Sequence, residues 1–385
     1  MINISKFDHC FGCGVCAAAC PKKIISMYIN EDGFFSPKVD ETRCVECGIC
    51  LDVCAFNHDE ICQQSFKPIS TAAWSNDADT RFNCTSGGAA YEIAKLLLAD
   101  GYKVCGVRYD ISQQKAEHII VTNEEELKLT VGSKYIQSET FSAFSQFKLS
   151  EKYFVVGTPC QIDSLRLWIR KRKWEDNFIL MDFFCHSVPS VLMWKKYLEY
   201  TGIKNPDIVQ FRNKRNGWPD STTVLITGDG REWFSALSKG DLFYAFFLGD
   251  RCPNECCVKE CKYKQQKSAA DIRIGDLWGY KYINNQKGVN SLVAFTHKGS
   301  EIIRRLESYC TLEPCDFKTV SELQMKHNVV PKRSWSTVRE LLKTNHSITY
   351  IYRRARIIEI PESLPQALKY YYKRILQKLH LKNEN

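Results

Sequence analysis

The 385-residue sequence lacks several features that would define its class. It has no stretch of about 18 apolar residues, which argues against a membrane-spanning helix. Its start does not form a signal peptide, because Asp8 and His9 stand where an apolar segment is needed. No part has a disordered composition, and no G-x-G-x-x-G dinucleotide fingerprint occurs. These absences favour a folded cytoplasmic protein, and a hydrophobic content of 44% supports a large core and more than one domain.

Cysteine, in contrast, is abundant, with 19 residues. In a reducing compartment we expect these residues to be metal ligands or buried thiols and not disulfides. Five of them have no partner at ligand spacing and are interpreted as structural: Cys62, Cys84, Cys105, Cys310 and Cys315.

Eight cysteines near the N-terminus form two copies of the spacing C-x2-C-x2-C-x3-C, 34 residues apart, which indicates a duplicated unit. In bacterial two-cluster ferredoxins, three closely spaced cysteines hold one [4Fe–4S] cluster and the fourth ligates the other cluster. The spacing therefore predicts two clusters with crossed ligands. The first ligand set is Cys10, Cys13, Cys16 and Cys54, and the second is Cys44, Cys47, Cys50 and Cys20.

Two all-cysteine zinc sites are the alternative, but they explain neither the cysteine triplets nor Pro21 directly after the fourth cysteine. Between the copies, residues 25–30 and 34–40 are predicted as strands joined by a turn. The second copy of the motif differs from the first after its fourth cysteine, where it has Ala55 and the first copy has Pro21. We expect this difference to loosen the local helix start without removing a ligand.

The middle of the chain alternates strand and helix patterns, with a short linker after Phe66. Residues 85–101 are predicted as a helix that Ser86 caps and Gly101 ends. A second helix begins with Thr158 as the cap and Pro159 at its first position. There are too few βαβ repeats for a plain Rossmann fold. The predicted class is α+β (mixed α/β), with a bacterial-type 2[4Fe–4S] ferredoxin domain fused to a larger mixed α/β domain.

Several cysteines in the middle of the chain could bind a third metal centre. Cys160 lies in the first turn of its predicted helix, where backbone amides favour a thiolate, and Cys185 ends a strand just before His186. Cys257 and Cys261 lie close together, with Cys252 and Cys256 nearby. The alternative is that Cys160 and Cys185 are small buried residues, and that only the 252–261 group binds metal or none does.

Seven motifs occur in one order after the cysteine-rich start: TSGGAA, GSKYIQS, VGTPCQI, FCHSVPS, FRNKRNGW, CKYK and ADIRIGDLWG. Together they resemble the coenzyme F-420 (deazaflavin) hydrogenase/dehydrogenase beta-subunit family over roughly residues 1–325. The resemblance implies an iron–sulfur flavoprotein oxidoreductase that passes electrons between [4Fe–4S] clusters, FAD and a two-electron partner. That partner is the deazaflavin or another small organic substrate, and some bacterial relatives belong with surface-polysaccharide synthesis. A non-catalytic electron-transfer subunit that connects a partner enzyme to a ferredoxin is the alternative.

The resemblance also implies a third [4Fe–4S] cluster on Cys160, Cys185, Cys257 and Cys261. The last two residues are spaced C-x3-C where the family pattern is C-x2-C, so Cys252 and Cys256 remain substitutes.

FAD is implied by the family alone, and several residues are candidates to bind it. Ser86, Gly87 and Gly88 at a helix start can cradle a phosphate, or can simply cap and pack that helix. Arg212 and Lys214 are predicted on one face of a strand, where they bind an anion or face solvent.

Two further residues are candidates near a bound flavin. His186 is a candidate proton donor, or a histidine satisfied within the fold. Asp276, in the GDLWG motif with Trp278, is expected either to contact the cofactor or to pack in the core.

The C-terminal region carries the basic character of the chain. Residues 326–385 contain 13 Lys and Arg against 4 Asp and Glu, a net charge of +9 that equals that of the whole chain. A cationic amphipathic helix is predicted there, with Leu368, Tyr372, Ile375 and Leu379 interleaved with Lys369, Lys373, Arg374 and Lys378. It can lie on the inner face of a membrane, dock on an acidic partner or pack on its own domain. Nucleic-acid binding is not expected, whereas a ferredoxin or another redox protein is an expected partner.

The predicted boundaries follow from these patterns. Residues 1–62 form the ferredoxin-type domain, 63–75 a linker, 76–325 the flavoprotein-like domain, and 326–385 a basic, mainly helical tail.

Overall fold

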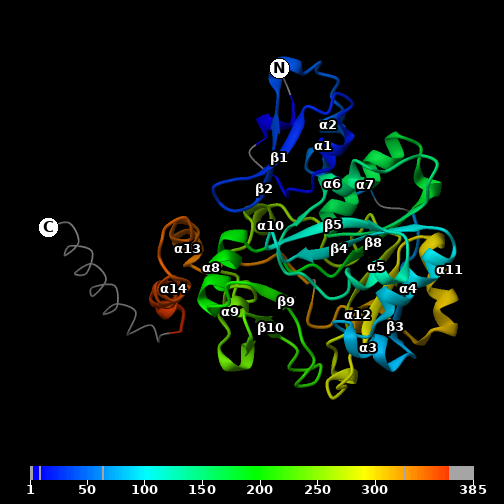
Figure 1. Cartoon of the computed structure of the whole chain (residues 1–385). Coiled ribbons are helices and arrows are strands. Elements are labelled where there is room, and N and C mark those ends of the chain that lie inside the picture. The colour runs from blue at the N-terminus through cyan, green and yellow to red at the C-terminus, as the bar shows by residue number, and fades with distance from the viewer. Residues whose placement is uncertain (1–2, 8–9, 63–64, 325, 364–385) are drawn as a thin grey trace.

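The computed structural model describes residues 3–7, 10–62, 65–324 and 326–363. An N-terminal unit lies above a large sheet with helices on both faces, and two C-terminal helices lie to one side (Figure 1). The mixed α/β class is therefore confirmed. No helix within these ranges is long and apolar enough to cross a membrane.

The N-terminal unit is built around a hairpin of β1 (Ile25–Ile29) and β2 (Phe35–Val39), as predicted. Asn30 closes the turn, because its Oδ1 accepts the amide of Phe34 at 3.0 Å, and Gly33 takes the left-handed conformation there. The cysteine loops lead into two short helices, α1 (Val15–Ala19) and α2 (Ile49–Asp52). Three single 3-10 turns complete the unit, at Ile4–Lys6, Glu41–Arg43 and Ala55–Asn57.

The large unit contains a nine-stranded sheet of order β14-β3-β13-β12-β8-β7-β4-β5-β6. Its centre, from β12 to β4, is parallel, whereas β13, β3 and β14 on one side and β5 on the other pair antiparallel. A plain Rossmann fold is thus excluded, as the sequence indicated. The strands are β3 (Ile69–Ser75), β4 (Lys103–Asp110), β5 (Lys115–Val121), β6 (Ser138–Glu139), β7 (Tyr153–Val156), β8 (Phe178–Phe183), β12 (Ile272–Asp276), β13 (Asn290–Ala294) and β14 (Cys310–Cys315). Strand β3 lies within the stretch predicted as a linker.

Helix α7 (Pro159–Lys171) covers one face of the sheet and begins as predicted. Thr158 forms a capping box with Gln161, and Pro159 occupies the first position. Its apolar side shares a core with Val15 of α1 and Val53 beside α2, so this helix supports the N-terminal unit.

Helix α4 (Ala89–Ala99), on the opposite face with α11 (His297–Arg305), begins differently from the prediction. Ser86 does not cap it, since the Ser86 hydroxyl donates to Val289 O at 2.8 Å. Gly88 occupies the cap position in the left-handed conformation, and Asn290 Oδ1 of β13 accepts the Ala89 amide at 3.0 Å. The cap therefore comes from 201 residues away, which local sequence cannot reveal. The end is as predicted, with Gly101 left-handed.

A smaller sheet of β9 (Pro206–Gln210), β10 (Thr223–Gly228) and β11 (Arg231–Ala236) packs with α8 (Val191–Thr201) and α9 (Leu242–Phe247). The pairing of β9 with β10 is antiparallel. Helices α13 (Trp335–Leu342) and α14 (Ile348–Ser363) complete this core through Val338, Leu342 and Ile351 (Figure 1). The predicted amphipathic helix around residues 368–379 lies outside the described residues.

The remaining short helices connect these layers. They are α3 (Ala78–Asn83), α5 (Glu124–Lys128), α6 (Phe141–Phe144), α10 (Glu255–Lys259) and α12 (Phe317–Val320).

Candidate functional site

The first predicted ligand set, which we call site 1, consists of four cysteines that the structure brings together: Cys10, Cys13, Cys16 and Cys54. Burial raises the pKa of all four thiols. The negative charges of neighbouring cysteines raise it further for Cys10, Cys16 and Cys54, for Cys54 to about 11. The Gly12 amide donates to Cys10 Sγ at 3.1 Å, and the Ser164 hydroxyl of α7 bonds Cys13. Buried sulfurs with such donors suit a metal cluster, which takes up thiolate charge.

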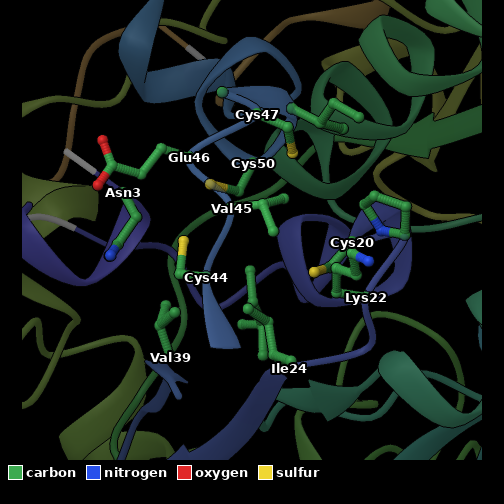
Figure 2. Close-up of a pocket in the computed structure, with 14 residues that line it drawn as sticks. Asn3, Cys20, Lys22, Ile24, Val39, Cys44, Val45, Glu46, Cys47 and Cys50 are labelled. Carbon is green, nitrogen blue, oxygen red and sulfur yellow. The ribbon is translucent and has the colours of Figure 1, made fainter. Parts of the chain in front are cut away.

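The second set, site 2, lines a small pocket: Cys20, Cys44, Cys47 and Cys50 (Figure 2). In Figure 2 the side chains of these residues surround the pocket, with Val39 and Ile24 below them. Cys47 is exposed to solvent, whereas the others are half-buried. Site 2 therefore lies nearer to the surface than site 1.

Site 1 faces the large unit through Gln137 and Thr140, which flank the short strand β6. Gln137 donates to Phe11 O and accepts the Phe35 amide, both at 2.7 Å, and Thr140 donates to Cys13 O at 2.8 Å. These contacts hold both the first cysteine loop and the β1–β2 hairpin against the sheet.

The third predicted set, which we call the inner cysteine group, also converges: Cys160, Cys185, Cys257 and Cys261. Burial raises the pKa of the Cys160, Cys185 and Cys257 thiols, that of Cys185 to about 11, and mutual repulsion among the thiolates adds to it. The expectation that the helix start favours a Cys160 thiolate is therefore outweighed by burial.

The CKYK segment, which includes Cys261, joins the cysteine loops. Lys262 donates to Ala55 O and His58 O of the N-terminal unit, each at 2.7 Å. Lys264 donates to Cys185 O at 2.8 Å, and Tyr263 donates to Asp163 of α7 at 2.9 Å. Its two lysines thus fasten the loops that carry Cys54 and Cys185.

Site 1 and the inner cysteine group are close neighbours. The charge of Cys13 raises the pKa of Cys160, and the Cys10 amide donates to the sulfur of Cys256, the residue before Cys257. Among the described residues, no three His, Cys, Asp or Glu side chains are close enough to hold a single metal ion. This finding concerns single ions, whereas a four-iron cube binds each thiolate to a different iron.

The inner cysteine group lines a cavity of about 1090 Å³ in the large unit. Aromatic and aliphatic side chains form much of its wall, including Phe11 from the N-terminal unit. Nine predicted site residues line it: Ser86, Gly88, Cys160, Cys185, His186, Arg212, Cys257, Cys261 and Asp276. Gly87 and Lys214 are not among its lining residues.

The predicted strand position of Arg212 and Lys214 is wrong, because β9 ends at Gln210. Both side chains are buried, so neither faces solvent. Arg212 pairs with Asp276, which raises the pKa of Arg212 against the opposing effect of burial. Lys214 donates to Ser86 O at 2.7 Å and Lys287 O at 2.9 Å, and burial lowers its pKa to about 8.

Gly87 and Trp278 are held by neighbours within the fold. A Cβ on Gly87 would lie 2.6 Å from Ala73 O, so this glycine allows close packing against β3. Trp278 lines the cavity, but its ring stacks on Trp218 at 4.5 Å with the Arg212 guanidinium 5.2 Å from its centroid.

His186 lies in the cavity wall and is held by a partner that the sequence did not indicate. Its Nε2 is 2.7 Å from Asp250 Oδ1, and Asp250 itself takes a left-handed conformation with φ 53°. Aspartate is one of the few non-glycine residues that adopt this conformation readily.

Lys134 is a cavity residue that sequence reasoning missed. It lies in the GSKYIQS motif, which served only to recognise the family. Burial lowers the pKa of its amine to about 7, and this unusual pKa is the signal that marks it.

Comparison with protein families identifies the class of protein. Residues 9–58 match the "4Fe-4S dicluster domain" family, so the chain is an iron–sulfur protein with a dicluster domain at its N-terminal end. Residues 70–145 match the N-terminal part, and residues 150–318 the C-terminal part, of the family described as "Coenzyme F420 hydrogenase/dehydrogenase, beta subunit". The chain belongs to the coenzyme F420 hydrogenase/dehydrogenase beta-subunit family, whose members are oxidoreductase subunits.

Among solved structures, a chain of the F420-reducing [NiFe] hydrogenase complex from Methanosarcina barkeri is similar. The two share 16% sequence identity over 71% of this chain and 87% of that chain, with a TM-score of 0.46. No curated protein matches the chain.

Proposed function

We propose that this protein is an iron–sulfur flavoprotein oxidoreductase that exchanges electrons between its N-terminal clusters and an organic two-electron partner in the cavity. The observation that supports this proposal most is the position of the inner cysteine group, which adjoins site 1 and also lines the cavity. A non-catalytic connecting subunit would not need a cavity of this size beside its cysteines.

We propose that sites 1 and 2 each hold a [4Fe–4S] cluster and that the inner cysteine group holds a third. Each site offers four thiols, the donor set of such clusters. When bound, the clusters would supply one-electron transfer and FAD would supply two-electron transfer.

The cavity fits a flavin nucleotide. Its volume of about 1090 Å³ reaches the upper end of ordinary ligand pockets, and its lining is mainly apolar with a few polar groups. Of the predicted cofactor residues, we propose Ser86, Gly88, Arg212 and Asp276 as its neighbours, because these line the cavity.

The chain's own residues would prepare this cavity for the chemistry. Apolar walls exclude water, and Asp250 orients His186, which we propose as the proton donor. The exposed edge at Cys47 suits a ferredoxin or another redox protein as the partner. We place the protein in the cytoplasm on the basis of its many unpaired cysteines.

Anaerobic purification, with iron, sulfide and flavin measured per chain, tests the proposal. We expect about twelve irons in the wild type, about eight in Cys160→Ala and about twelve in the control Cys105→Ala, because each cluster holds four irons. Cys105 is a matched control since it is fully buried and lies outside the proposed ligand sets. We also expect flavin absorbance that a reductant bleaches.

Two results would overturn parts of this account. Clusters without flavin would favour the connecting subunit. Equal iron in the wild type and Cys160→Ala, near eight per chain, would exclude the third cluster but leave the dicluster domain intact.

A further inference from the structure

Lys134 places an amine in the cavity wall without an acidic partner. It lies in the loop between α5 and β6, and its Nζ donates to Thr130 O at 2.9 Å and Val131 O at 2.8 Å. Within the described residues, no Asp or Glu forms an ion pair with this amine, and the titratable group that affects it is the Cys84 thiol. Arg212, in contrast, is neutralised in the same cavity by Asp276.

A charged amine without an acidic partner is energetically unfavourable in the wall of this cavity. Removing a cation from water without a counter-charge destabilises the charged form, which explains why the pKa of Lys134 falls to about 7. An anion in the cavity would remove that cost and restore the ammonium. The two carbonyl contacts leave one amine hydrogen for such a ligand.

The neighbouring groups also favour an anion. The Ser133 amide donates to Thr85 Oγ1 at 2.9 Å, so the loop of Lys134 is fastened to the loop that precedes α4. Thr85, Ser86 and Gly88 line the cavity there, at the start of a helix of 11 residues with no side-chain cap from Gly88. Asn290 Oδ1 already accepts the Ala89 amide, so it is the dipole of this helix that makes the start of α4 positive.

A second cation strengthens the positive field at the same loop. Lys214 lies behind it and donates to Ser86 O at 2.7 Å. Both Lys134 and Lys214 lower the pKa of Cys84, against its burial and against the opposing charge of Glu92 in the first turn of α4. Two lysines thus lie near Cys84, on the side of the cavity where helix α4 starts.

We propose that Lys134 and the start of α4 form a phosphate-binding subsite of the cavity. This inference rests on the proposed function, because it assigns the anionic part of a ligand that the cavity would hold. The phosphate belongs either to a flavin nucleotide or to a phosphorylated substrate, and the experiment separates these sources.

The test uses the anaerobically purified, iron-loaded full chain, freed of flavin. Binding of FAD, FMN and riboflavin is measured by quenching of flavin fluorescence, and binding of inorganic pyrophosphate by calorimetry. The variants are Lys134→Met, Lys134→Arg and the control Lys204→Met, since Lys204 is exposed and does not line the cavity. Iron content and thermal unfolding show whether each variant is folded.

If the subsite holds a flavin phosphate, Lys134→Met should weaken the binding of FAD and FMN by about ten- to a hundredfold, as expected for a lost charge-assisted hydrogen bond. The affinity for riboflavin, which has no phosphate, should not change. Lys134→Arg should keep most of the affinity, and Lys204→Met all of it. If only pyrophosphate binding depends on Lys134, the subsite serves a substrate phosphate.

The proposal is overturned if neither the flavin nucleotides nor pyrophosphate respond to Lys134→Met in a folded, iron-loaded protein. Absence of flavin binding in the wild type would instead contradict the proposed function, while the pyrophosphate measurement would still decide the subsite.

Discussion

Single residues distinguish the two copies of the cysteine motif, and their neighbours explain why. Gly12 is left-handed, and a Cβ there would lie 2.3 Å from Gln137 Nε2. Its counterpart Glu46 is also left-handed but faces solvent, where a side chain has room. A Cβ on Gly12 would also lie 2.6 Å from the backbone oxygen of Phe35 in β2, so the glycine is required by close packing against β2 as well as against the large unit, and not by the turn alone.

The replacement of proline by Ala55 has a similar cause. The Ala55 amide donates to Ser164 Oγ of α7 at 3.1 Å, a bond that proline cannot make. The expectation that alanine loosens the local helix start at residue 55 is thus incomplete, because the Ala55 amide forms a hydrogen bond with the large unit.

At Lys134 we predict a pH dependence of FAD affinity. The amine has a pKa of about 7 without ligand, so its charged form is lost as the pH rises from about 6 to about 8.5. Because phosphate favours the ammonium, FAD binding should weaken by about tenfold across this range. Titrations of FAD fluorescence at several pH values measure this change.

Two titratable groups lie near Lys134, and Lys214, whose pKa burial lowers to about 8, changes charge in the same pH range. The Cys84 thiol, with burial raising its pKa to about 11, stays neutral throughout the range. Lys134→Arg should bind FAD with a weaker dependence on pH than the wild type, because guanidinium remains charged and only the contribution of Lys214 is left. Equal pH profiles in the two proteins would contradict the assigned role.

At the scale of elements, α13 fastens the N-terminal hairpin to the large unit. Arg339 forms ion pairs with Asp32 at 2.6 Å and with Glu255 of α10 at 2.9 Å, and Lys343 reaches Asp32 at 2.9 Å. These contacts lower the pKa of Asp32, chiefly through the Arg339 hydrogen bond. The helix thus links the hairpin to the segment that carries Cys257.

We predict that Arg339→Met loosens this hairpin. Hydrogen–deuterium exchange of residues 25–39 should become faster, because both carboxylates lose their shared cation. Arg215→Met, which breaks an exposed pair with Glu232, should leave that exchange unchanged. Unaltered exchange in Arg339→Met would show that the other contacts of the hairpin, such as Ser190 with Asp32 O, suffice.

Local elements could be predicted from sequence where their signals are local. The hairpin turn and the start of α7 depend on residues within a few positions, and both agree with the structure. The cap of α4 by Asn290 and the partner of His186 come from distant segments, so no local pattern contains them. The sequence predicts Arg212 on a strand, whereas β9 ends at Gln210 and Arg212 lies beyond it in an ion pair with Asp276.

At the scale of the whole molecule, the cysteine groups lie in an order from solvent to cavity. Site 2 has the exposed Cys47, site 1 contacts the large unit, and the inner cysteine group lines the cavity. The cysteine spacing predicted the members of sites 1 and 2, and the family resemblance implied those of the inner cysteine group, but the order depends on how the two units pack. That packing rests on contacts such as Lys262 with Ala55 O, which no spacing reveals.

The most direct test of this account is a single-turnover reaction of the flavin-loaded protein with a reduced ferredoxin, which is too large to enter the cavity. Flavin absorbance is followed anaerobically in the wild type and in Cys54→Ala, with iron analysis to show that site 2 remains loaded. The account predicts that flavin bleaches in the wild type and at least about tenfold more slowly without site 1. Equal rates in the two proteins would contradict a route from the N-terminal clusters to the cavity.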